Sequence, residues 1–366
     1  MKAKWIRTGA ACGFVVCVMA LLSAPALASF PGSNGKIAVA TLDQGIETIA
    51  PDGSGRSPLI AHAHNPAWSA DSAKLAYSTQ EIFVSDANGG NQIQLTSSGI
   101  RGSRDDPSWS PDGSKIVYTD TVCYISGVCG YGLMFLPSDG SGTQTPGGDG
   151  KQPAWSPRGD KIAYTSDGTH CFNPYGFVIV CNSQIFTKNV DLSGRVRLSD
   201  DTAYDYDPNW SPDGSKVVFA TNRDEPHPID CQFTYDCNVE IYGMNADGTG
   251  LTRLTNGPGE DRWPAWSPDG TKIVFSSNRA TVGTGCSYTC DHDLYVMNAD
   301  GTAQTRLTNT PVQELDSDWQ PLPLPTPADF KNAAQFCKTE RARLGESGFR
   351  GRYGNNGGCV SQTRRG

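Results

Sequence analysis

The sequence predicts an all-β fold, a six-bladed β-propeller whose blades are four-stranded antiparallel sheets. Tryptophan recurs at intervals of 41 to 56 residues, a period typical of propeller or solenoid repeats. Short β-branched and aromatic runs, separated by Gly and Pro turns, follow every recurring tryptophan except the last. The two ends of the chain also carry complementary partial repeats. The recurring residues are Trp68, Trp109, Trp155, Trp210, Trp266 and Trp319.

Each Trp-bearing strand leads into a turn, which reads Ser-Pro-Asp-Gly at residues 110–113, 211–214 and 267–270. Pro presets φ, Asp bonds back to the backbone and Gly accepts a positive φ, so we interpret these residues as structural. Second, third and fourth strands follow, as at residues 272–275, 293–297 and 305–308. The first repeat has neither Pro nor Gly at residues 69–72, so its turn is expected to be the weakest.

The partial repeats at the ends set the blade count. Residues 36–40, 46–50 and 58–60 read as the second, third and fourth strands of a repeat that has no Trp strand. Residues 316–319 read as a first strand with no successor. We therefore expect five complete blades and one shared by both ends, a closure that removes exposed sheet edges.

The phrases at residues 210–255 and 266–308 resemble the repeats of the TolB-type (PD40, WD40-like) β-propeller family of exported bacterial proteins. The resemblance covers about residues 31 to 320 and implies an interaction scaffold. Related propellers also accompany peptidase domains or process sugars. TolB itself carries a domain before its propeller, and prolyl-oligopeptidase-type enzymes need an α/β-hydrolase domain. We expect neither domain here.

Four segments are expected. Residues 1–28 combine a basic start, a short apolar run and an Ala-x-Ala exit, as in a cleavable secretory signal, with a membrane anchor as the alternative. The propeller would span 29–320, a Pro-rich linker 321–327 and a small basic module 328–366. The expected location is extracytoplasmic, in the periplasm or outside the cell. No other apolar stretch is long enough to span a membrane.

The ten cysteines outside the signal form five close pairs. In an exported chain this favours local disulfides, with zinc binding as the alternative near His292. Four pairs fall in enlarged second-to-third loops, which we place at residues 120–130, 167–183, 222–238 and 278–292. The pairs are Cys123 with Cys129, Cys171 with Cys181, Cys231 with Cys237, Cys286 with Cys290, and Cys337 with Cys359 in the tail.

The formal net charge of -8 argues against nucleic-acid binding. The tail from Ala328 is basic, so it either contacts an anionic cell-wall polymer or folds against the acidic propeller. An N-terminal cap and an apolar stripe predict a helix in the tail, from about residue 327 to 344.

Candidate ligand-binding residues gather on the face that carries the second-to-third loops. Tyr124, Tyr175, Tyr235 and Tyr288 lie in those loops, where aromatic rings either bind sugars or peptides or pack inward around the disulfides. The inter-blade connections bring charged groups to the channel, where they either bind Ca²⁺ or a cationic ligand or cap strands. These channel candidates are His64, Asp106, Asp207, Arg262 and Asp316. They belong to an expected acidic ring with one or two basic members, to which the same connections add Asp105, Lys151, Asp205, Asp261 and Asp318.

These features favour a secreted, monomeric, non-enzymatic scaffold that binds a protein, peptide or glycan on the disulfide-bearing face. No catalytic residues and no resident cofactor are assigned. The alternative is a polysaccharide lyase or glycan hydrolase that uses His64 and acidic residues at the channel mouth.

Overall fold

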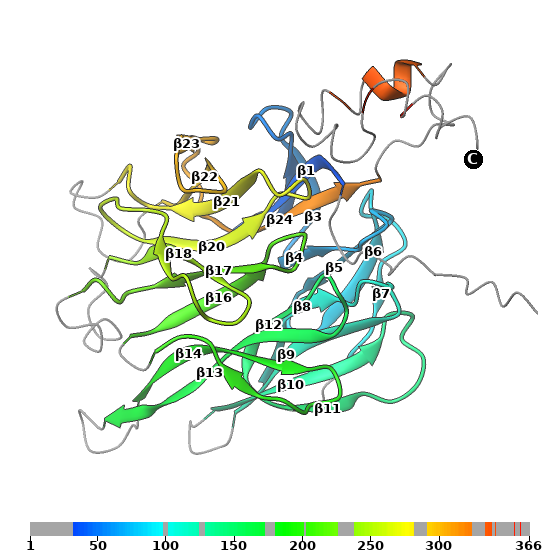
Figure 1. Ribbon diagram of the computed structural model, residues 1–366. Coiled ribbons are helices and arrows are strands. Elements are labelled where there is room, and N and C mark those ends of the chain that lie inside the picture. The colour runs from blue at the N-terminus through cyan, green and yellow to red at the C-terminus, as the bar shows by residue number, and fades with distance from the viewer. Residues whose placement is uncertain are drawn as a thin grey trace, which may run out of the picture.

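The computed structural model describes residues 32–97, 102–123, 129–172, 180–200, 203–225, 238–281, 291–323, 334–338, 341, 355 and 359. Within these residues the strands form six four-stranded antiparallel sheets arranged as the blades of a propeller (Figure 1). The predicted fold class and blade count are confirmed.

Five blades are continuous in sequence, and we number them from the first Trp. Blade 1 is β4–β7, blade 2 is β8–β11, blade 3 is β12–β15, blade 4 is β16–β19 and blade 5 is β20–β23. Blade 6 contains β24, β1, β2 and β3. The strands are β1 (Ser33–Thr41), β2 (Gly45–Ile49), β3 (Ser57–Ile60), β4 (His64–Trp68), β5 (Lys74–Ser78), β6 (Ile82–Asp86), β7 (Ile93–Gln94), β8 (Gly102–Trp109), β9 (Lys115–Cys123), β10 (Cys129–Pro137), β11 (Thr145–Asp149), β12 (Lys151–Trp155), β13 (Lys161–Phe172), β14 (Val180–Asn189), β15 (Val196–Arg197), β16 (Asp205–Trp210), β17 (Lys216–Thr221), β18 (Glu240–Asn245), β19 (Thr252–Arg253), β20 (Asp261–Trp266), β21 (Lys272–Ser277), β22 (Asp293–Asn298), β23 (Thr305–Arg306) and β24 (Glu314–Leu322).

Blade 6 closes the ring, because β1 pairs with β2 on one side and with β24 on the other. Ile37 lies opposite Trp319, and Val39 lies opposite Ser317. Each Trp-bearing strand contacts the Trp-bearing strand of the next blade, and β24 contacts β4. The two partial repeats therefore form one sheet, as the sequence predicts.

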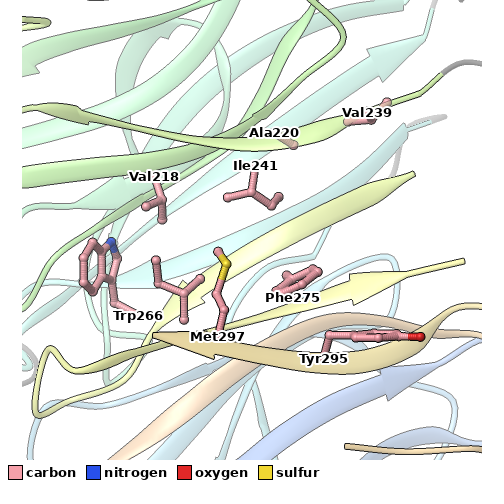
Figure 2. Close-up of a cluster of buried hydrophobic side chains, with 9 residues drawn as sticks. Val218, Ala220, Val239, Ile241, Trp266, Phe275, Tyr295 and Met297 are labelled. Atoms are coloured by element: carbon pink, nitrogen blue, oxygen red, sulfur yellow. The ribbon is translucent and has the colours of Figure 1, made fainter. Parts of the chain in front are cut away.

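The hydrophobic core lies between successive blades. Between blades 4 and 5, Val218 and Ile241 pack against Trp266, Phe275 and Met297 (Figure 2). Corresponding clusters fill the other interfaces, each with one of the recurring tryptophans. Trp68 and Trp319 are only 1% exposed. Because each blade alone would expose this apolar face to water, the blades stabilise one another.

The Asp-Gly turns are held by one repeated set of hydrogen bonds. In blade 2, Ser110 Oγ donates to Asp112 Oδ1 at 2.6 Å, and Ser110 Oγ accepts from the Lys115 backbone N–H at 2.9 Å. Gly113 takes the positive φ that this turn requires. In the first repeat, Ser72 takes the same conformation with a φ of 62°. The turn predicted to be weakest therefore keeps the same geometry without glycine.

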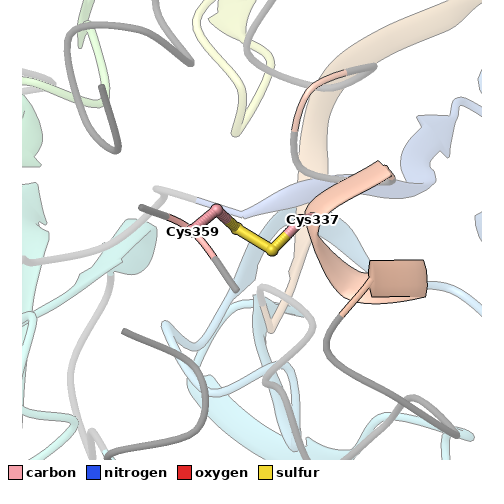
Figure 3. Close-up of a disulfide and its surroundings, with 2 residues drawn as sticks. All are labelled: Cys337 and Cys359. Carbon is pink, nitrogen blue, oxygen red and sulfur yellow. A yellow bond between two sulfur atoms is a disulfide. The ribbon is translucent and has the colours of Figure 1, made fainter. Parts of the chain in front are cut away.

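The described part of the tail includes a helical segment at residues 334–338. The predicted disulfide between Cys337 and Cys359 is present (Figure 3). Most of the helix predicted from 327 to 344, and the whole of the expected signal at 1–28, lie outside the described residues. Among the helices that the structure describes, none is long and apolar enough to cross a membrane.

Ring closure predicts the effect of truncation. A chain ended after Val312 lacks β24 and leaves β1 as an open edge, so we expect it to lose cooperative thermal unfolding. A chain ended after Pro323 keeps β24 and serves as the matched control, with the near-UV tryptophan signal of the full chain. Differential scanning calorimetry and circular dichroism measure both. A cooperative transition in the shorter chain would contradict closure by β24.

Candidate functional site

A ring of six side chains lines the central channel where the Trp-bearing strands begin. Each member lies three residues before its Trp, so every blade contributes one. A cavity of about 120 Å³ lies between them, with room for one side chain or several waters. We call this set the channel ring, which consists of Asn65, Asp106, Gln152, Asp207, Trp263 and Asp316.

A local backbone feature directs these side chains into the channel. Five of the six have a φ between 49° and 53°, which is unusual for residues other than glycine. The pairing of the first and second strands also shifts register at this point in all five blades. Such bulges re-aim a side chain. Proline follows the ring residue in those blades, whereas Ser317 takes its place in blade 6.

The amide members of the ring bridge its carboxylates. Asn65 Nδ2 donates to Asp106 Oδ1 at 2.9 Å and to Asp316 Oδ2 at 3.1 Å. Gln152 Nε2 donates to Asp207. Thr119 Oγ1, from β9, donates to the second oxygen of Asp106 at 3.0 Å. The ring is therefore a connected polar network that spans blades far apart in sequence.

Acidic and basic residue types alternate around the channel. The ring carboxylates come from blades 2, 4 and 6, whereas a basic side chain one position earlier comes from blades 1, 3 and 5. The basic groups are His64, Lys151 and Arg262. The sequence predicted an acidic ring with one or two basic members. In the structure three basic residue types adjoin the ring, and Asp105 and Glu260 lie beside two of them.

Each basic group has a neighbour that orients it. His64 Nε2 lies 3.1 Å from Asp105 Oδ1, and the imidazole is 43% exposed. Lys151 Nζ lies 5.2 Å from the ring centre of Tyr131. Arg262 pairs with Glu260, with 3.1 Å between Nε and Oε2, and its guanidinium lies over Tyr206. These contacts fix the orientation of the three basic side chains at the channel mouth.

The ring carboxylates hold protons unusually tightly. Burial, reinforced by the negative charge of Asp105, raises the pKa of Asp106 to about 6. Burial and the charge of Asp106 raise the pKa of Asp207 to about 7, although Arg262 opposes the shift. Burial and the charges of Asp207 and Asp106 raise the pKa of Asp316 well above its usual value. The ring therefore changes its protonation near neutral pH.

Other carboxylates expected near the channel have structural partners. Asp205 is 0% exposed and accepts from Arg223 Nη2 at 3.1 Å, and Asp261 pairs with Arg279 in the same way. Asp318 accepts the Trp68 backbone N–H at 2.7 Å, which joins blade 6 to blade 1. Burial raises the pKa of Asp318 to about 7. Asp205 and Asp261 therefore form ion pairs with arginine, and Asp318 accepts a backbone N–H.

The second-to-third segments of blades 2 and 3 are hairpin extensions rather than the long loops expected there. β9 continues to Cys123, which is disulfide-bonded and lies opposite Cys129. β13 continues to Phe172, with Cys171 opposite Cys181. In blade 2, Thr119, Thr121 and Val122 favour extended backbone and prolong the strands.

Several predicted residues lie outside the described part of the chain. They are Tyr124, Tyr175, Tyr235, Tyr288, Cys231, Cys237, Cys286 and Cys290. Conversely, sequence reasoning missed Asn65, Gln152 and Trp263 as ring members. Their shared position, three residues before a recurring Trp and directly before Pro, could have identified them.

The described side chains are not arranged as a metal-binding site. Within the described ranges, no group of three or more His, Cys, Asp or Glu side chains is placed to hold a metal ion. Asn65 and Gln152 instead hydrogen-bond the ring carboxylates. The arrangement can donate and accept hydrogen bonds and bind both signs of charge.

The raised pKa values predict a pH dependence of stability. An unfolded Asp titrates near pH 3.9, so between about pH 4 and about pH 7 the folded state binds the Asp207 proton more tightly. This contribution to stability is fully present below about pH 4 and is lost as the pH rises through about 7. Asp207→Asn should therefore raise the free energy of unfolding at about pH 8 by on the order of 1–2 kcal/mol, less than the full shift implies because solvent in the channel screens it.

Urea denaturation at several pH values measures this effect. The matched control is Asp247→Asn in an exposed turn, where hydrogen bonds from Thr249 lower the pKa of Asp247, so it should not alter the slope between about pH 5 and about pH 8. An Asp207→Asn profile parallel to that of the unmodified chain would show that the ring carboxylates titrate normally.

The buried Arg–Asp pairs predict a separate effect. Arg223→Met leaves the Asp205 charge buried without its partner, so we expect a loss of about 3–5 kcal/mol in unfolding free energy. Adding Asp205→Asn should recover most of it. Arg158→Met, at an exposed guanidinium that binds the Asp213 carbonyl, should cost less than about 0.5 kcal/mol. Equal losses of unfolding free energy in Arg223→Met and Arg158→Met would show that the Arg223–Asp205 pair does not stabilise the fold.

Comparison with known proteins supports the fold. No protein-family model matches the chain. It is 30% identical over 133 residues to an uncharacterized protein of Agrobacterium fabrum, covering 36% of this chain and 37% of that protein. It is 31% identical over 129 residues to the TolB homolog of Chlorobaculum tepidum, covering 26% of this chain and 27% of that protein. The chain thus spans well under half the length of these curated relatives.

Among solved structures, TolB from Acinetobacter baumannii matches with a TM-score of 0.61 and 18% identity. The match covers 80% of this chain and 68% of that one. With the sixfold closure and the Trp-centred repeats, these similarities agree on one architecture: the chain has the fold of the TolB-like six-bladed β-propellers.

Proposed function

We propose that this chain is an exported binding scaffold that takes a peptide segment of a partner protein at the channel ring. The observation that supports this most is that three carboxylates line one polar cavity, while a basic residue directly precedes each of the other three ring members in the sequence. A peptide presents hydrogen-bond donors and acceptors along its backbone and charged side chains of either sign. Export rests on the signal-like residues 1–28.

The geometry of the ring suits one inserted side chain with its flanking backbone. The cavity of about 120 Å³ accepts a side chain but not a folded domain. Five ring residues have strained positive φ values, and such strain is more common at binding sites than elsewhere. Trp263 adds an apolar surface to an otherwise polar ring, so a partner gains area as well as hydrogen bonds.

A glycan is the alternative ligand, since the same indole and amides suit a sugar ring. A glycan-cleaving enzyme is the second candidate, and the observation that favours it is the hydrogen bond between His64 and Asp105. A carboxylate that orients an exposed imidazole resembles an arranged general base. Release of unsaturated or reducing sugar by the purified protein, abolished by His64→Ala, would favour this enzyme over the scaffold.

The binding proposal is tested with peptide and glycan arrays, followed by calorimetry on the best ligand. Asp207→Asn and Trp263→Ala should each weaken peptide binding by about tenfold or more, equivalent to about 1.4 kcal/mol. Asp247→Asn, at an exposed turn on the opposite end of blade 4, is the matched control and should bind normally. Affinity should fall with added salt, because the ring is charged.

Three outcomes would contradict the peptide proposal. They are selective binding of glycans alone, binding unaffected by both ring variants, and equal loss in the Asp247→Asn control.

A further inference from the structure

A second cavity, of about 770 Å³, lies between blades 4 and 5 at the turn end of the strands, opposite the channel ring. Its inner wall consists of Val218, Gly243, Leu254 and Trp266. Val218 and Trp266 lie at one end of the interface core, away from Val239 and Tyr295 (Figure 2). We call it the Gly243 cavity, and it is independent of the proposed function.

The cavity exists because blade 4 has glycine at a position where every other blade has a side chain. Gly243 pairs with Val218, the third residue of the second strand. The corresponding pairing in the other five blades places Thr48, Val84, Phe135, Thr187 and Val296 there. A Cβ on Gly243 would lie 3.4 Å from the end of the Leu254 side chain, so the backbone does not require glycine.

The equivalent groove between blades 2 and 3 shows how an aromatic side chain can fill this space. There Phe135 meets Trp155 edge-on, with 5.6 Å between ring centres, and the remaining cavity is about 310 Å³. Trp266 corresponds to Trp155 and Gly243 to Phe135. Among the described residues that line the Gly243 cavity, no aromatic ring other than Trp266 is present. The Gly243 cavity therefore has room for an aromatic ring beside Trp266, where Phe135 lies beside Trp155.

The rim of the Gly243 cavity is acidic. Asp213, Asp269 and Asp300 line it, with Lys216 as the one basic lining residue among those described. Turn hydrogen bonds fix these carboxylates, such as those from Ser267 Oγ to Asp269 at 2.7 Å and from Thr302 Oγ1 to Asp300 at 2.6 Å. A fixed negative rim above an apolar wall complements a ligand with an apolar body and a cationic end.

We propose that the Gly243 cavity is a binding site for an aromatic ring that carries a positively charged amine. The ring packs against the Trp266 indole in the place that Phe135 takes beside Trp155. The ammonium group faces the rim carboxylates Asp269 and Asp300. Burial of the ligand's aromatic ring supplies most of the affinity, and the rim carboxylates select for its ammonium group.

Isothermal titration calorimetry with 2-phenylethylamine tests the site, with 2-phenylethanol and 3-phenylpropionate as neutral and anionic probes of the same ring. We expect saturable binding of the amine, about tenfold tighter than that of the anion. Gly243→Val should fill the cavity and weaken amine binding by about tenfold or more without lowering the melting temperature. Asp269→Asn should weaken binding of the amine but not of the alcohol.

Thr187→Val, at the corresponding position in blade 3, is the matched control and should bind the amine normally. Unchanged binding in Gly243→Val, or equal binding of all three probes, would overturn the proposal. Phe30 precedes the lining residue Gly32 by two positions in the sequence. If the amine binds only after Phe30→Ala, the chain's own phenylalanine is the occupant and the proposal of an external ligand is wrong.

Discussion

The pairing of β1 with β24 is the constraint on which the structure depends. It converts a row of blades into a ring, so every blade has two neighbours and every recurring Trp is packed between sheets. A row left open would expose the apolar face of its terminal blades and the edge of β1. The pairing spans nearly the whole propeller in sequence, so the ring can complete only when both ends are in place.

Closure also creates the chemistry of the channel. Six strand starts meet at one axis, and each bulge directs one side chain inward. Carboxylates that are distant in sequence then raise one another's pKa. The buried carboxylates cost stability at neutral pH, although Asn65 and Gln152 link them by hydrogen bonds across neighbouring blades. A site that opposes stability is more readily explained by binding than by folding.

The repeat made the fold predictable, because turn chemistry and strand pattern agree in every blade and the end repeats complement each other. The tail disulfide followed from cysteine spacing. The channel ring was predicted only in part: Asp106, Asp207 and Asp316 were identified by charge, whereas Asn65, Gln152 and Trp263 share only a position. Asp205 and Asp261 were expected near the channel. Their pairing with Arg223 and Arg279 could not be predicted from the sequence, because it depends on which residues the strand register places side by side. The Gly243 cavity emerges only when aligned blades are compared, because an absent side chain leaves no local pattern.

Hydrogen exchange measured by mass spectrometry tests closure most directly. If β24 completes the sheet of blade 6, peptides covering residues 33–41 and 314–322 should exchange only through global unfolding, as slowly as those covering β17 in the middle of blade 4. Rapid exchange in both end peptides, with slow exchange in β17, would show that the ring is open in solution and that the channel ring is not assembled as described.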